Sequence, residues 1–124
     1  MRDAKKVILC VDDDNDILDF LKIVLEKNGY IVFIANSAEA GLRKYKEIHP
    51  DALIVDLMTE EVDSGLQMTK ELKFIGNTSP VFMLSSTGDN LFESADYNQL
   101  GLSGLLQKPV MPEHLIQLIR SKLR

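Results

Sequence analysis

The stretch VILCVDDDNDIL, residues 7–18, passes from five apolar side chains directly into four acidic ones and an asparagine, and then turns apolar again. Its apolar part, residues 7–11, has the length and composition of a strand that is buried on both faces of a sheet. Crowded carboxylates repel one another and resist the loss of solvent. Their place at the end of a buried strand therefore needs a chemical reason, and residues elsewhere in the chain supply one.

The whole chain has the size and composition of one soluble globular domain. It contains 124 residues, of which 45% are hydrophobic and 27% are charged, enough for one core and too few for two ordinary domains. The net charge is −5 and no basic run extends beyond Lys5-Lys6, so no direct nucleic-acid contact is expected. Tyr30, Tyr45 and the five phenylalanines are expected to be core or partly buried residues.

The sequence predicts a cytoplasmic protein without a membrane partner. The apolar run of residues 7–11 is too short for a signal-peptide core or a membrane span, and Asp12 ends it. The single cysteine, Cys10, cannot form an internal disulfide, which fits a reducing compartment. Cys10 is expected to be a small core residue.

Short apolar runs alternate along the chain with stretches of helical periodicity. We expect strands at residues 7–11, 30–35, 52–57, 81–84 and 104–107. We expect helices at residues 16–27, 65–75, 91–98 and 112–123. A further helix is expected to begin after a cap at Asn36-Ser37 and to end at about residue 47. Five strands that alternate with five helices predict an α/β fold, with a doubly wound parallel sheet and helices on both faces.

Polar residues follow four of the five predicted strands. They are Asp12 and Asp13 after the first, Asp56 near the end of the third, Ser85 and Ser86 after the fourth, and Lys108-Pro109 after the fifth. Because ligands of open α/β sheets bind at the carboxyl ends of the strands, we expect these side chains to converge on one site. Three carboxylates there would raise one another's pKa values. Mg²⁺, which prefers oxygen ligands, would relieve that repulsion.

The charges of this set suit phosphoryl transfer. Three aspartates, one Mg²⁺ and the Lys108 ammonium carry no net formal charge together, so the pocket can receive a phosphoryl group. Asp56 can attack phosphorus as a nucleophile and form an acyl phosphate. The metal, Lys108 and Ser85 would then stabilise the charge on the equatorial oxygens.

The order of these motifs resembles the receiver domain of bacterial two-component response regulators. The motifs VDDD, IVDL, MLSS and QKP follow or end the first, third, fourth and fifth strands, in the family's order and with about its spacing. The resemblance covers essentially residues 1–124 and implies one receiver domain with the flavodoxin-like (CheY-like) fold. It further implies that a sensor histidine kinase or a histidine phosphotransfer protein passes a phosphoryl group from a phosphohistidine to Asp56.

The resemblance also implies the metal ligands. Asp13 matches the direct Mg²⁺ ligand and Asp12 its partner, which acts directly or through water. Asp56 is a ligand as well as the phosphoacceptor. Met58, two residues further on, would offer its backbone carbonyl to the metal.

The remaining implied roles concern the phosphoryl group and the signal. Ser85 matches the family's switch hydroxyl, and Lys108 matches the lysine that contacts the phosphoryl group. The Lys108-Pro109 bond matches a cis peptide bond of the family. The resemblance thus implies a switch, not a turnover enzyme, whose only reactions are self-phosphorylation from a donor and slow autodephosphorylation. Its downstream protein would bind the face formed by the fourth helix, fifth strand and fifth helix.

Three features depart from the family's pattern. Glu60 stands where a proline is usual, and the loop of residues 58–65 is one residue longer. Leu105, three residues before the lysine, replaces the usual aromatic switch residue. No output domain follows the last predicted helix before Arg124, which leaves open a stand-alone receiver or one excised from a larger regulator or hybrid kinase.

Other functions remain as alternatives. A degenerate receiver that docks a partner without phosphorylation is favoured slightly by the altered loop and by Leu105. A haloacid-dehalogenase-like phosphatase also uses a nucleophilic aspartate with Mg²⁺, but Met58 stands where it needs a second acid, and the chain has no room for a cap domain. An EF-hand is excluded because Ile17 replaces the required glycine. The acids at Asp14 and Asp16 are expected to begin the first helix.

Overall fold

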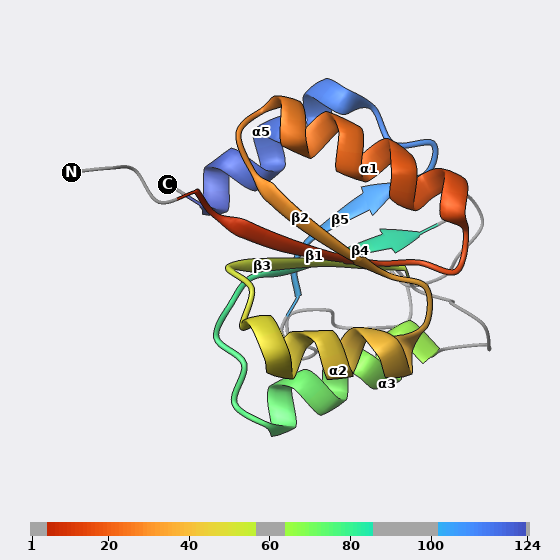
Figure 1. Cartoon of the computed structure of the whole chain (residues 1–124), viewed down its shortest axis with the longest axis vertical. Helices are drawn as coiled ribbons and strands as arrows, with labels where there is room; N and C mark the ends of the chain where they lie inside the picture. Colours follow the sequence, from red (N-terminus) through yellow and green to blue (C-terminus); the bar gives the residue numbers. More distant parts are fainter. Residues whose placement is uncertain (1–4, 57–63, 86–101, 124) are drawn as a thin grey trace.

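A computed structural model of the chain describes residues 5–56, 64–85 and 102–123. It contains one sheet of five parallel strands in the order β2-β1-β3-β4-β5, with helices on both faces (Figure 1). The strands are β1 (Val7–Val11), β2 (Ile31–Ala35), β3 (Ala52–Asp56), β4 (Val81–Ser85) and β5 (Leu102–Gln107). This strand order is that of the flavodoxin-like doubly wound fold, so the predicted fold class is confirmed.

Four helices lie within the described residues, two on each face of the sheet. They are α1 (Asn15–Lys27), α2 (Ala38–Ile48), α3 (Ser64–Phe74) and α5 (Pro112–Lys122). Helices α1 and α5 cover one face, and α2 and α3 cover the other (Figure 1). The helix predicted at residues 91–98 lies outside the described residues. None of the four helices is both long enough and apolar enough to cross a membrane.

The sequence predicted the bounds of the four described helices within two residues, and local capping signals explain the starts of α1 and α2. The Asp14 side chain accepts a hydrogen bond from the Asp16 N–H at the start of α1, over 2.9 Å. Ser37 caps α2 in the same way, with 3.0 Å between its Oγ and the Ala40 nitrogen. At the end of α2, His49 adopts the left-handed conformation with φ 46°, a common way to end a helix.

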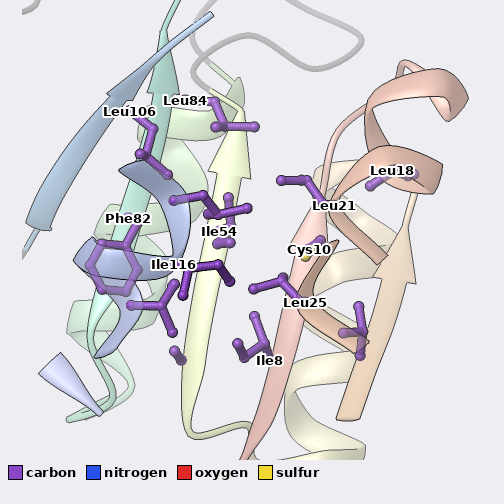
Figure 2. Close-up of a cluster of buried hydrophobic side chains, with 14 residues drawn as sticks. Ile8, Cys10, Leu18, Leu21, Leu25, Ile54, Phe82, Leu84, Leu106 and Ile116 are labelled. Atoms are coloured by element: carbon purple, nitrogen blue, oxygen red, sulfur yellow. The ribbon is translucent and has the colours of Figure 1, made fainter. Parts of the chain in front are cut away.

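The strand β1 supplies side chains to two separate hydrophobic cores. Its alternate residues Ile8 and Cys10 lie with α1 and α5, whereas Leu9 and Val11 lie with α2 and α3. Figure 2 shows the first core, where side chains of α1 and α5 meet side chains of the sheet over β1 and β3. Cys10 is fully buried, and burial, followed by the charge of Asp12, raises the pKa of its thiol. The prediction of a two-faced buried strand with an inert core cysteine is confirmed.

The predicted burial of the phenylalanines is wrong at Phe74 and Phe33, and Phe92 lies outside the described residues. Phe82 is fully buried, but Phe74 is 88% exposed at the end of α3. Helical spacing places Phe74 on the side away from Met68 and Leu72, which pack on the sheet. Phe33, on the edge strand β2, remains 36% exposed.

Helix α2 packs tightly against the sheet and α3 at Gly41. A Cβ atom at this position would lie 2.8 Å from Val11 Cγ2 and 3.0 Å from Met68 Cε. Both distances are shorter than normal van der Waals contact. Because Val11 is β-branched and held in the sheet, it has little freedom to move aside.

Overpacking of a core costs about 1–3 kcal/mol, and alanine returns about 1 kcal/mol in a helix interior. Because Val11 cannot easily move aside, we therefore expect Gly41→Ala to lower the free energy of unfolding by a net of about 1–2 kcal/mol. Chemical denaturation measures the change, with Lys46→Ala on the exposed side of α2 as the control, expected to stay within about 0.5 kcal/mol of wild type. A Gly41→Ala protein as stable as wild type would contradict this account of the close approach.

Candidate functional site

The carboxyl ends of four parallel strands lie along the same end of the sheet and carry the polar residues that the sequence singled out. Asp12 follows β1, Asp56 ends β3, Ser85 ends β4 and Lys108 follows β5. Backbone hydrogen bonds hold two of these positions. The Asp12 N–H donates to the Ala35 carbonyl over 3.1 Å, and the Lys108 N–H donates to the Ser85 carbonyl over 2.8 Å. The site is thus positioned by the sheet itself.

Lys108 forms an ion pair with two buried acids at once. Its Nζ lies 3.2 Å from Asp12 Oδ2 and 3.1 Å from Asp56 Oδ1. The Asp12 side chain is fully buried and that of Asp56 is 9% exposed, so solvent screens these charges only weakly. The sequence expected Lys108 near a phosphoryl group; the structure shows that it also bridges the two carboxylates.

Three carboxylates gather beside this lysine. Oxygen atoms of Asp12, Asp13 and Asp56 lie within 4.8 Å of one another, and Asp13 is the exposed member. The donor set consists of carboxylate oxygens, which suits a hard cation such as Mg²⁺ better than a soft transition metal. This cluster could therefore hold a metal ion.

Two buried oxygen atoms of the site have no hydrogen-bond partner among the described residues. They are Asp12 Oδ2, which lies at ion-pair distance from Lys108 without hydrogen-bond geometry, and Ser85 Oγ. An unsatisfied buried polar atom costs about 1–3 kcal/mol and is uncommon in native proteins. These atoms fit a site completed by a bound group that supplies positive charge and an oxygen acceptor.

Burial and charge shift the pKa values of the site in ways that favour a cation. Burial, followed by the charge of Asp12, raises the pKa of Asp56 from 3.8 to about 6, and Lys108 only partly opposes this. Burial likewise raises the pKa of Asp12, against the opposing hydrogen bond from the Asp14 N–H and the charge of Lys108. Burial lowers the pKa of Lys108, but the two carboxylates outweigh it and the net pKa is raised, so Lys108 remains an ammonium at neutral pH.

One contact within the site was not predicted from the sequence. The Asp14 backbone N–H donates to Asp12 Oδ1 over 2.9 Å and so orients the Asp12 carboxylate. Backbone N–H groups cannot be identified from residue types alone. The signal that was available is the spacing of the two residues, since an aspartate often accepts a hydrogen bond from the N–H two residues further on.

The other predicted positions have mixed outcomes. Met58, Glu60 and Ser86 lie outside the described residues. The Lys108-Pro109 bond is cis, as predicted. Leu105 is partly buried on β5 and packs against the core beneath α2 and α3, so an aliphatic side chain occupies the position where an aromatic one is usual in receiver domains.

The charged form of Asp56 should destabilise the folded, metal-free protein. Because its pKa rises from 3.8 to about 6 on folding, the folded state binds the proton more tightly, and this stability is lost as the pH rises from about 4 to about 6. Asp56→Asn removes this charge. We therefore expect the variant to be more stable than wild type at about pH 7.5 with a chelator present, by about 1–3 kcal/mol in the free energy of unfolding.

Denaturant titrations at two pH values check this expectation. The difference between Asp56→Asn and wild type should shrink toward about pH 4, where wild-type Asp56 is protonated in the folded state. Asp19→Asn, an exposed change on α1, is the control and should leave stability within about 0.5 kcal/mol at both pH values. Equal stabilities of Asp56→Asn and wild type at both would disprove the electrostatic destabilisation.

Comparison with curated proteins relates the whole described fold to one family. Residues 8–120 match the family model of the response regulator receiver domain. The chain is 34% identical over 117 residues to response regulator MprA of Mycobacterium leprae, covering 94% of this chain and 50% of that protein. It is 31% identical over 119 residues to the alkaline phosphatase synthesis transcriptional regulatory protein PhoP of Bacillus subtilis, covering 96% and 49%. The chain thus spans about half the length of the curated relatives it matches.

Solved structures give the same result. A putative response regulator from Chloroflexus aurantiacus has a TM-score of 0.87 and 31% identity, covering 97% of this chain and 98% of that one. A CheY-like response regulator receiver domain protein from Methanospirillum hungatei also has a TM-score of 0.87, at 30% identity, covering 97% and 94%. With the strand order and the acidic cluster beside Lys108, these matches show that the chain belongs to the response regulator receiver domain family.

Proposed function

We propose that this domain is a phosphorylation-switched signalling element in which Asp56 accepts a phosphoryl group from a phosphohistidine. The observation that carries the proposal is the arrangement of Asp56 at the end of β3, 3.1 Å from the Lys108 ammonium and beside the acids Asp12 and Asp13. Membership of the receiver family supports it. The donor would be a sensor histidine kinase or a histidine phosphotransfer protein.

The proposed step exchanges one bond to phosphorus for another. A carboxylate oxygen of Asp56 attacks the phosphorus, a P–O bond forms, and the P–N bond to the imidazole breaks with its electron pair leaving on nitrogen. A pKa of about 6 leaves Asp56 ionised at neutral pH, as a nucleophile must be. The Lys108 ammonium, already paired with Asp56, can neutralise charge on the phosphoryl oxygens.

The acidic cluster fits Mg²⁺ as the resident metal. The carboxylates of Asp12, Asp13 and Asp56 would hold it, with the Met58 carbonyl, outside the described residues, as a further ligand. The buried Asp12 Oδ2, which no hydrogen bond reaches within the described residues, supports this fit. When bound, the ion supplies positive charge that offsets the carboxylates and stabilises charge on the phosphoryl oxygens.

We further propose that Ser85 transmits the change. Its buried hydroxyl, which finds no partner among the described residues, can donate a hydrogen bond to a phosphoryl oxygen. Leu105 has no ring to move in response, so the face that β5 and α5 form with the predicted fourth helix should change only modestly. A downstream protein on that face would then shift the equilibrium only by its small differential affinity. A cytoplasmic location is part of this proposal.

The first test is covalent. Incubation with phosphoramidate or acetyl phosphate and Mg²⁺ should add one phosphoryl group, visible by intact mass and labile to hydroxylamine as acyl phosphates are. Asp56→Asn should gain no mass, whereas the control Asp19→Asn should react like wild type. A stable adduct on a serine or threonine would refute the acyl-phosphate assignment. No adduct at all would favour an interaction module that acts without phosphorylation, and turnover of a simple phosphomonoester would favour a phosphatase.

The second test concerns the metal. We expect Asp12→Ala to weaken Mg²⁺ binding by about tenfold, and Asp13→Ala to weaken it more. The reason is that Asp12 is already engaged by the Asp14 N–H and by Lys108, whereas Asp13 is exposed and available as a direct ligand. Isothermal titration with Mg²⁺ measures both affinities. Unchanged affinity in both variants would show that the acidic pair does not bind the metal.

A further inference from the structure

The edge strand β2 exposes apolar side chains where edge strands are usually protected. It stands at one end of the strand order, and Ile31, Phe33 and Ile34 are 41%, 36% and 39% exposed. Natural sheets guard such edges with charged residues, proline or bulges. The strand sequence IVFIA contains no charged residue and no proline, so this edge is suited to pairing with another strand.

The backbone of β2 is oriented for such pairing. The Ile31 N–H donates to the Lys6 carbonyl over 2.9 Å, and the Ala35 carbonyl accepts from the Asp12 N–H over 3.1 Å. Because the groups of a parallel strand point alternately to its two sides, residues 31, 33 and 35 bond to β1. The N–H and C=O groups of Val32 and Ile34 therefore point outward from the sheet.

A hollow borders this edge between the two helical layers. Its volume is about 280 Å³, and it is lined by Asn15 and Leu18 of α1, Ile34 and Asn36 of the β2 end, and Lys44 of α2. The Lys44 ammonium also lies 5.7 Å from the centre of the Phe33 ring. The hollow therefore leaves open space beside the carboxyl end of β2.

The charges at the two ends of this edge indicate which segment pairs with it. Near the carboxyl end of β2, α1 begins after Asp14 and carries Asp16 in its first turn, and Lys44 offsets part of that negative charge. Near the amino end, the exposed Lys5 and Lys6 precede β1, and the Lys6 carbonyl accepts from the Ile31 N–H, whereas the bases that end the two flanking helices each have a glutamate beside them. The carboxyl end of β2 is therefore the more acidic of the two ends and the amino end the more basic. A second copy placed antiparallel brings the acidic end of each edge against the basic end of the other, whereas a parallel copy would oppose like charges.

We propose that two copies of this chain associate through antiparallel pairing of their β2 strands about a two-fold axis, joining their sheets into one. The register that uses only outward groups sets Phe33 opposite Phe33 of the partner subunit and Val32 opposite Ile34 of the partner subunit. Val32 and the partner's Ile34 exchange backbone hydrogen bonds. The two Phe33 rings meet as a cross-strand aromatic pair.

This association does not depend on the proposed phosphoryl transfer. Asp56 ends the central strand β3, and Lys108 follows β5 at the opposite edge of the sheet (Figure 1). Pairing through β2 leaves that site outside the interface. Asp56→Asn should therefore associate like wild type, and failure of either proposal can be recognised without the other.

Charge substitutions at the symmetry axis test the proposal. Wild type should show a concentration-dependent dimer in sedimentation equilibrium. Phe33→Lys and Phe33→Glu should each weaken it by about tenfold or more, because like charges come to lie directly opposite. An equimolar mixture of the two variants should restore a dimer. Ile23→Lys, on α1 and 58% exposed, is the matched control and should associate like wild type. If a Phe33 variant fails to fold, Ile34→Lys takes its place.

Cross-linking tests the register. Directly opposed residues of a non-hydrogen-bonded antiparallel pair have Cα atoms about 4.5 Å apart, within the span of a disulfide. Phe33→Cys should therefore oxidise rapidly to a covalent dimer, and Ile23→Cys should not. The natural Cys10 is fully buried and will not compete.

Three outcomes would overturn the proposal. The first is a wild type that stays monomeric up to near-millimolar concentration, with Phe33→Cys oxidising no faster than Ile23→Cys. The second is a dimer that the Phe33 charges do not weaken, which would place the interface on another surface. A monomer that instead binds an added β-strand peptide at this edge would identify a strand of another protein as the occupant.

Discussion

The ion pair of Lys108 with both Asp12 and Asp56 is the interaction on which the candidate site depends. Two carboxylates at the ends of adjacent strands are buried together, where their repulsion is poorly screened. Burial and then the charge of Asp12 raise the pKa of Asp56, and Lys108 offsets them only in part, so that pKa remains at about 6. The folded protein therefore retains an electrostatic strain at this edge, and the proposed Mg²⁺ would relieve it by binding.

The sheet supplies the rigidity that holds these charges together. Strands β1 and β3 are buried along almost their whole length and contribute alternate side chains to two cores. A shift of one residue in either register would turn its acid to the other face. Burial of the strands thus determines where Asp12 and Asp56 lie, and the Lys108 N–H bonded to Ser85 joins the fifth strand to the same edge.

The sheet's two kinds of boundary suit different tasks. At the carboxyl ends of the strands, polar side chains and oriented backbone groups gather around one point, which suits chemistry. Along the outer side of β2, a regular series of backbone groups and the exposed Phe33 suit association. Because these boundaries lie at different places in the sheet, a domain of this size can carry both without one obstructing the other.

The sequence by itself determined the fold class, the helix caps and the chemical residues of the site. These features follow from local causes: periodicity sets the element type, Asp14 and Ser37 provide N-cap oxygens, and strand-end acids such as Asp56 follow directly after apolar runs. Phe74 illustrates the limit, because the sequence predicted its helix correctly but not its 88% exposure.

Only the tertiary structure decided how those residues act on one another. The shared ion pair of Lys108, the raised pKa of Asp56 and the lack of a hydrogen bond to Asp12 Oδ2 within the described residues depend on distances and burial that join residues far apart in the chain. The exposure of Phe33 depends likewise on β2 becoming an edge strand. The order of residue types does not specify the distance between two charges or the dielectric of their surroundings, and these set the strength of a charge interaction. Nor does it specify which surfaces other parts of the chain cover, and this sets how accessible a side chain is.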